Sequence, residues 1–221
     1  MSTLSADYVA FFRGLEKNNT SAWFAAHKED YEQHVKKPFE ALVAVMIARI
    51  AKLEPDVKIG PRDAISRIHK DVRFSKDKTP YNVHLSANIS PYGKKNKAWP
   101  GFYFQVGTKL AVYGGAYALE TPELARVRKA IVKDKAGFAK VCKGKAFTKA
   151  FGGIQGEKNK VLPPELRAAA EKEPLVANKQ FYFRAELDPK WITSPKLEDE
   201  LMKLHAAAAD MTAWLRLALR G

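Results

Sequence analysis

One stretch of the sequence, RIHKDVRFSKDKTPY at residues 67–81, crowds cationic side chains among apolar ones. Arginine has a planar guanidinium that binds phosphate or carboxylate through two parallel hydrogen bonds, and lysine adds a point charge. The chemistry that this pattern favours is the binding of a phosphorylated or otherwise anionic small molecule in a basic pocket. The ligand-binding residues that we predict are Arg67, Asp71, Arg73, Ser75, Lys78 and Tyr81.

The order of residues in this stretch predicts a β-strand over 67–74, because alternate side chains of an extended chain point to opposite faces. One face would then carry Arg67, His69, Asp71 and Arg73, and the other Ile68, Lys70, Val72 and Phe74. SKDKTP would turn the chain into a second strand with a polar face of His84, Ser86 and Asn88. Two such faces side by side would form a compact binding platform.

Asp71 has four interpretations. Its carboxylate could orient a neighbouring arginine, or it could act as a general base while Arg73 stabilises developing negative charge, which makes it a weak catalytic candidate. The charges could also form a purely structural lattice of exposed ion pairs, each contributing about 1 kcal/mol or less. Asp71 with His69 and His84 could hold a metal ion, but the arginines on the same face would repel it, so we predict no metal site. No cofactor is implied, and enzyme activity is left open.

The net charge of +14 is concentrated in two segments. Residues 67–109 contain nine Lys or Arg against two Asp, and residues 126–160 contain eleven against two acidic residues. Two basic segments on an otherwise balanced chain are typical of a nucleic-acid-binding module, which is the alternative function. Lysine dominates 126–160, and lysines that only solvate the surface would give the same composition. An interaction protein with a purely structural motif is the second alternative, and the oligomeric state is left open.

The composition is that of a folded globular protein, with 46% hydrophobic and 28% charged residues among 221. This length predicts one domain over residues 1–221, or at most two closely joined ones. The longest uncharged apolar run, at 41–48, is far shorter than the roughly 20 residues that span a bilayer, so we predict no membrane partner. The first residues show no secretion signal, which favours the cytoplasm. Cys142 is predicted to be an inert helix cysteine despite its lysine neighbours.

The apolar periodicity predicts an α+β fold in which N-terminal and C-terminal helices pack on an antiparallel meander. Helical spacing is expected over 5–17, 21–37 and 38–55, with a break or restart at Pro38. Alternation then predicts strands at 83–90, 101–107 and 109–119, and a later strand at 180–187. Helices are expected from about 121, 136 and 164, and over 195–220. Gly114 and Gly115 indicate either a bulge or the close approach of a ligand.

These residues also carry a family resemblance. RIHKDVRFSKDKTPYNVH, preceded by NNTSAWFAAHKEDYEQHVKKPFEAL and followed by PGFYFQV and GGAYALETPELARVRKAI, resembles the domain-of-unknown-function 2461 family from about residue 11 to past 183. Members are conserved hypothetical proteins, so the resemblance implies no activity. Within the motif, nine positions match the family pattern: Arg67, Asp71, Arg73, Phe74, Ser75, Asp77, Lys78, Pro80 and Tyr81. His69, Lys70 and Asn82 depart from it, which argues against a catalytic role for His69 that the family shares.

The N-terminal stretch NNTSAW is first a helix cap over a tryptophan anchor. As an alternative, Asn18, Trp23 and Lys28 could line the same cleft as the basic motif.

Overall fold

The computed structural model describes residues 4–73 and 75–221 and has an α+β fold. Its four-stranded antiparallel sheet has the order β1-β2-β3-β4. The strands are β1 (His84–Ile89), β2 (Phe102–Gly107), β3 (Leu110–Ala116) and β4 (Phe181–Leu187). Neighbouring strands follow one another in the chain, which confirms the predicted meander, although a long helical connection separates β3 from β4.

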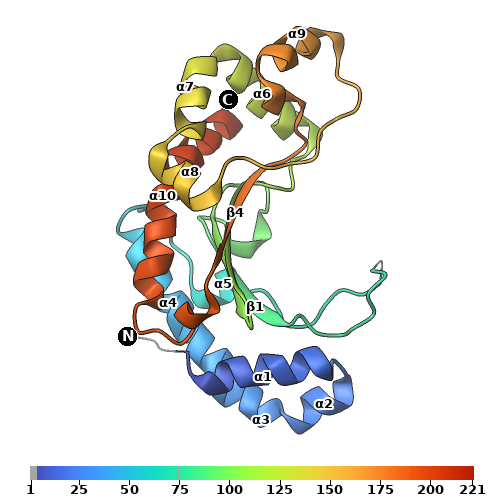
Figure 1. Cartoon of the computed structure of the whole chain (residues 1–221), viewed down its shortest axis with the longest axis vertical. Coiled ribbons are helices and arrows are strands. Elements are labelled where there is room, and N and C mark those ends of the chain that lie inside the picture. The colour runs from blue at the N-terminus through green and yellow to red at the C-terminus, as the bar shows by residue number, and fades with distance from the viewer. Residues whose placement is uncertain (1–3, 74) are drawn as a thin grey trace. The chain divides into compact units, whose positions relative to one another are not determined.

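Helices precede, interrupt and follow the sheet (Figure 1). Before it come α1 (Ala6–Lys17), α2 (Ser21–Ala26), α3 (Lys28–Asp30), a π-helical turn (Tyr31–Lys36), α4 (Lys37–Ala51) and α5 (Pro61–Ala64). Between β3 and β4 come α6 (Thr121–Lys133), α7 (Lys135–Cys142), α8 (Lys145–Phe151) and α9 (Pro164–Lys172). The chain ends in α10 (Leu197–Arg220), and short 3₁₀ turns occur at Gly93–Lys95, Pro174–Ala177 and Pro189–Trp191. Over the described residues, no helix combines the length and the apolar character that crossing a bilayer requires.

The chain divides into two compact units. The first unit comprises residues 1–95, 103–112 and 186–203. The second unit comprises residues 96–102, 113–185 and 204–221. The organisation of the whole chain as one domain stays a prediction.

The core of the first unit forms where α1 and α4 bury their apolar faces. On α1 and on α4 the buried side chains recur at helical spacing, so each helix buries one apolar stripe, and Ala41, Ala44 and Ala48 on the other side of α4 are exposed. Phe39 of α4 meets Phe104 of β2 with ring centroids 5.8 Å apart. The hydroxyl of Tyr8 donates to the backbone carbonyl of Val106 at 2.9 Å, and burial raises the pKa of Tyr8 well above its ordinary value. These contacts hold α1 and α4 against the sheet.

Pro38 does not break the helical chain, but an α-helix restarts there, which is one of the two expected outcomes. Residues 28–51 remain helical, and Pro38 occupies the first turn of α4. The turn immediately before it, Tyr31–Lys36, is π-helical. Proline removes one backbone donor and its ring crowds the preceding turn, and the wider π turn accommodates both effects.

The core of the second unit is an aromatic cluster between α8 and β4. Phe147 and Phe151 pack against Phe183, with ring centroids 5.1 Å and 4.7 Å away. A Cβ at Gly114 would lie 2.5 Å from the Phe183 ring, and Gly115 has a φ of +96° with the neighbouring strand against it. Both glycines therefore serve the packing of β3 against β4, and the structure assigns them no ligand.

Candidate functional site

The predicted motif forms an arm, residues 67–81, that leads out from α5 and returns to β1 (Figure 1). The expected strand is not formed at residues 67–73, because the backbone pairing that the structure describes there is the isolated bridge between His69 and Tyr81. Two backbone bonds make this bridge and close the base of the arm, from the Lys70 amide to the Pro80 carbonyl at 2.8 Å and from the Asn82 amide to the Ile68 carbonyl at 2.7 Å. Proline offers no amide to extend such a ladder.

The predicted alternation of side chains holds despite the lost strand. Arg67, His69, Asp71 and Arg73 are exposed, whereas Ile68 is buried. Two-residue periodicity therefore predicted the environment of the side chains but not the pairing of the backbone. Phe74, expected on the apolar face, lies outside the described residues.

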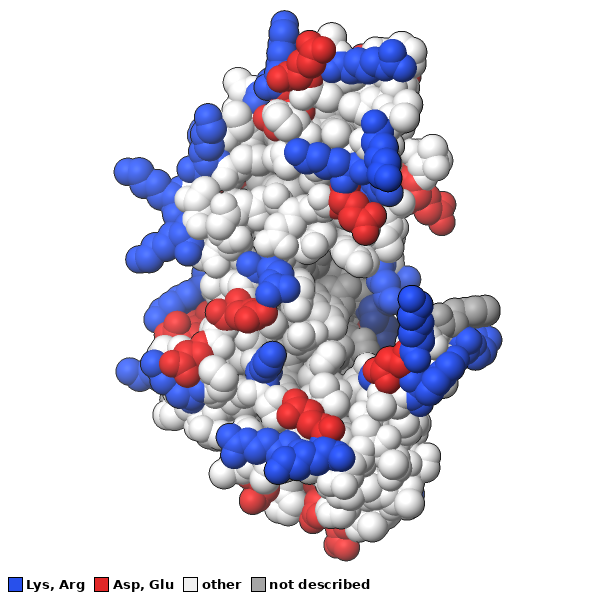
Figure 2. Space-filling model, turned by 45° about the vertical axis from the view of Figure 1, so that its right-hand side comes forward, with Lys and Arg blue, Asp and Glu red and all other residues white. Residues whose placement is uncertain are grey.

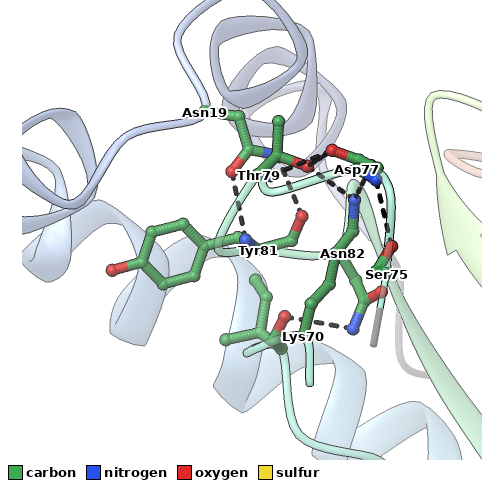
Figure 3. Close-up of polar contacts among 8 residues, drawn as sticks. Asn19, Lys70, Ser75, Asp77, Thr79, Tyr81 and Asn82 are labelled. Atoms are coloured by element: carbon green, nitrogen blue, oxygen red, sulfur yellow. Dashed lines mark hydrogen bonds and ion pairs between the residues drawn. The ribbon is translucent and has the colours of Figure 1, made fainter. Parts of the chain in front are cut away.

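An asparagine from another part of the first unit anchors the arm. The side chain of Asn19 pairs with the backbone of Tyr81 through two hydrogen bonds (Figure 3): its amide nitrogen donates to the carbonyl at 2.9 Å, and its oxygen accepts from the N–H at 3.1 Å. The Tyr81 ring is buried and stacks on Phe24 of α2 at 4.2 Å. Tyr81 thus fixes the base of the arm with its ring buried, and its role in ligand binding stays a prediction.

A polar network braces the distal half of the arm (Figure 3). The ammonium of Lys70 donates to Asp77 and to the Thr79 hydroxyl, each at 2.7 Å. Asp77 also accepts from the backbone and hydroxyl of Thr79 at 2.9 Å and 2.7 Å, and the Asp77 amide donates to Ser75 at 3.1 Å. The bond from Lys70, followed by those from Thr79, holds the pKa of Asp77 well below its usual range. Lys70, expected on the apolar face, is instead the centre of this brace.

Asp71 and Arg73 form the ion pair that the orienting interpretation predicts. Arg73 donates from Nε to one carboxylate oxygen at 2.9 Å and from a terminal nitrogen to the other at 2.7 Å. The hydrogen bonds from Arg73 lower the pKa of Asp71, to which the charge of Arg67 adds a smaller effect. A carboxylate with a lowered pKa is a weaker base, so the structure adds no support for Asp71 as a catalytic base.

The remaining predicted site residues are spread along the arm. Ser75 caps the Asp77 amide, and Lys78 donates to the Val72 carbonyl at 2.9 Å while remaining exposed. Neither the guanidinium of Arg67 nor the ammonium of Lys76 is bonded to any residue that the structure describes. The structure therefore pairs Asp71 with Arg73 and presents the other cations separately, and the ligand-binding role of the set stays a prediction.

A metal site does not form around His69, Asp71 and His84. Among the described residues, no group of three or more His, Cys, Asp or Glu side chains is arranged to hold an ion. Burial, followed by the charge of Lys70, lowers the pKa of His84.

The second basic segment, residues 126–160, forms α6 to α8 and the glycine-rich loop after them, all in the second unit. Arg128 is not a surface cation, because it is buried and donates to the Asn178 carbonyl at 3.0 Å. Burial also raises the pKa of the Cys142 thiol to about 12, which outweighs the opposing effect of Lys143. This agrees with an inert cysteine.

A family model described as "Conserved hypothetical protein (DUF2461)" matches residues 7–214. The chain belongs to the DUF2461 family. No curated protein and no solved structure gave a significant match. The family description names no activity, so the residues of this DUF2461 protein are the basis for any functional proposal.

Residues outside the motif hold features that the sequence did not reveal. Asn19, and not its neighbour Asn18, contacts the arm, across 62 positions of the chain. Trp23 lines a separate groove of the first unit together with other residues of α1 to α3. The signal for that groove is the spacing of Trp23 with His27 and of Asp30 with His34, since positions four apart share a helix face.

Proposed function

We propose that this DUF2461 protein binds an extended polyanion, with the exposed cations of the arm contacting the phosphates of a nucleic acid. The observation that carries this proposal is the display of Arg67, Arg73, Lys76 and Lys78, all exposed, along one braced arm. Figure 2 shows Lys and Arg side chains gathered at the right-hand edge of the view, where the arm stands, with acidic side chains among them.

The exposure of these residues favours a polyanion over the small anionic molecule that the sequence first suggested. A small anion needs several converging donors in a concave site. Here Arg73 already directs two of its donors at Asp71, so an incoming anion would compete with a carboxylate for them. Phosphates along a nucleic-acid strand require only separate cations along a surface, and each contact releases a condensed counterion.

The brace of the arm supports this function. Ordering exposed lysine and arginine side chains on binding costs conformational entropy. A backbone that is already fixed lowers the total entropy cost of binding. Lys70 supplies that fixation from within, because its charge is committed to Asp77. Within the arm, the Lys70–Asp77 pair belongs to an internal framework. The exposed lysine and arginine side chains form a separate, outward set. In the second unit, the exposed lysines of 126–160 would add contacts of the flexible, point-charge type.

The test is fluorescence anisotropy with labelled single-stranded DNA, duplex DNA and RNA, measured from low to roughly physiological salt. The double variant Arg67→Ala/Lys76→Ala should bind more weakly. The magnitude of its slope of log K against log[salt] should fall by about 1.4 on single strands or 1.8 on duplex DNA, if each side chain contacts one phosphate. Lys52→Ala is the matched control, because Lys52 is an exposed lysine at the C-terminal end of α4.

Arg73→Lys distinguishes the two ligand classes. A polyanion site should tolerate it, because the charge is kept, whereas a site that holds a small anion through the guanidinium fork should lose affinity sharply. Absence of salt-dependent binding to all three nucleic acids, or equal loss in the double variant and in Lys52→Ala, would contradict the proposal.

A further inference from the structure

A groove of about 520 Å³ lies in the first unit and is lined by residues outside the motif at 67–81. Its walls come from α1, α2, α3 and the π-helical turn, and the residues that matter are Asp7, Phe11, Trp23, His27, Asp30 and His34. This volume is within the range of small-molecule sites, roughly 300 to 1,000 Å³.

One wall of the groove is aromatic. The rings of Trp23 and His27 stack with centroids 4.0 Å apart and an interplanar angle of 15°, and Phe11 lies 5.3 Å from the indole. Gly14 on α1 makes this arrangement fit, because a Cβ there would lie 2.6 Å from a ring atom of Trp23. Indole, phenyl and imidazole are thereby held in place before any ligand arrives.

Most polar groups of the groove are acceptors, and the imidazole of His34 adds a donor. The Nδ1 atom of His27 lies 2.8 Å from the backbone carbonyl of Trp23 and donates to it, so a neutral ring leaves Nε2 as an acceptor. Asp7 and Asp30 contribute carboxylates. The Nδ1 atom of His34 lies 3.9 Å from a carboxylate oxygen of Asp7, and neither Asp7 nor Asp30 pairs with any lysine or arginine in the described part of the chain.

We propose that this groove binds an organic cation bearing N–H donors, either an ammonium or a guanidinium. Both carboxylates attract such a group, and the acceptor on His27 matches its donors. The aromatic wall adds attraction between the cation and the ring faces. Nucleic acid would be repelled by the same carboxylates, so this site is independent of the polyanion function of the arm.

The cation could belong to a free amine or to a lysine or arginine side chain of a peptide. Isothermal titration calorimetry on the full chain should therefore compare spermidine and agmatine with lysine and arginine capped at both ends. Diacetylated putrescine, which has no charge, is the negative control. Binding of the capped amino acids alone would identify a peptide ligand, and binding of the free amines alone would identify a small metabolite. Either result supports the proposal.

Three isosteric variants test the residues. Asp7→Asn and Asp30→Asn should each weaken binding by tenfold or more, because each removes a charge and keeps the shape. Glu29→Gln is the matched control, since Glu29 is exposed on α3 next to Asp30 but does not line the groove, and it should bind as the unmodified protein does. Circular dichroism checks that all three are folded.

NMR of the unmodified protein tests the proposal even if one of the variants fails to fold. In the unmodified protein, addition of spermidine or agmatine should shift the amide resonances of Trp23 and His27 and leave those of the arm in place. Lack of binding to every probe at millimolar concentration would overturn the proposal. Equal affinity of Asp30→Asn and Glu29→Gln would also overturn it.

Discussion

Replacing Asn19 with alanine should loosen the arm without unfolding the protein. The substitution removes both hydrogen bonds between this side chain and the Tyr81 backbone, at 2.9 Å and 3.1 Å. A typical intramolecular hydrogen bond contributes about 1 kcal/mol net, so the pair contributes about 2 kcal/mol, or roughly thirtyfold in the local opening equilibrium. Asn19 is half-buried, and water will replace part of this bonding, so we expect an increase of about tenfold to thirtyfold.

Native-state hydrogen exchange measures this opening at single amides. The amides of Lys70 and Asn82 bond across the base of the arm and should exchange faster by that factor. The amides of β1 should keep their rates. Asn18→Ala is the control, because the Asn18 side chain donates only to the Gly14 carbonyl within the described residues. Unchanged rates at Lys70 and Asn82 would refute the anchoring role of Asn19, and an equal increase in β1 would show global destabilisation instead.

Three further predictions concern other parts of the chain. The Cys142 thiol, with a pKa raised to about 12 from 9.0, should react with a thiol reagent at pH 8 about 1,000-fold more slowly in the native protein than after denaturation. The pKa of Asp77 is lowered, so its carboxylate is ionised at neutral pH and its hydrogen bonds stabilise the arm. This stabilisation is lost only when the pH falls through the lowered pKa and the carboxylate is protonated. A carboxyl NMR titration should show this, and Lys70→Met should raise the Asp77 pKa. Gly115→Ala should lower the free energy of unfolding by more than about 2 kcal/mol in urea melts, because φ is +96° and a Cβ would meet the next strand. Gly152→Ala, with φ of +74° and open space, should cost only about 1 kcal/mol.

The fold was predictable from the sequence where periodicity is long and consistent. The strand β1 and the helix α4 follow from side-chain spacing, because burial selects apolar residues at every second or every third to fourth position. Ser86, expected on the polar face of β1, is nevertheless buried. The same rule predicted which side chains of the arm are exposed. It could not predict that the arm lacks a continuous ladder of backbone hydrogen bonds. That outcome depends on Pro80, which has no amide to donate, and on the irregular conformation of the facing segment.

The candidate site was predictable only in part. The sequence predicted that Asp71 orients a neighbouring arginine, and the structure shows that its partner is Arg73, two residues away. The brace from Lys70 to Asp77 and the clamp from Asn19 depend on chain folding that no local pattern encodes. The groove escaped notice because its two aspartates lie on exposed positions of helices that are distant in the sequence, where a single acidic residue is ordinary.

The most direct test of the polyanion function is an NMR titration of the isotope-labelled protein with a short single-stranded oligonucleotide at low salt. If the arm contacts the phosphates, amide resonances within residues 67–81 shift, and the side-chain resonances of Arg67 shift with them. The shifts should disappear as salt is raised, while the resonances of Trp23 and His27 in the groove stay in place. Shifts confined to residues outside the arm, or no shifts at low salt, would contradict the proposal that the arm binds nucleic acid.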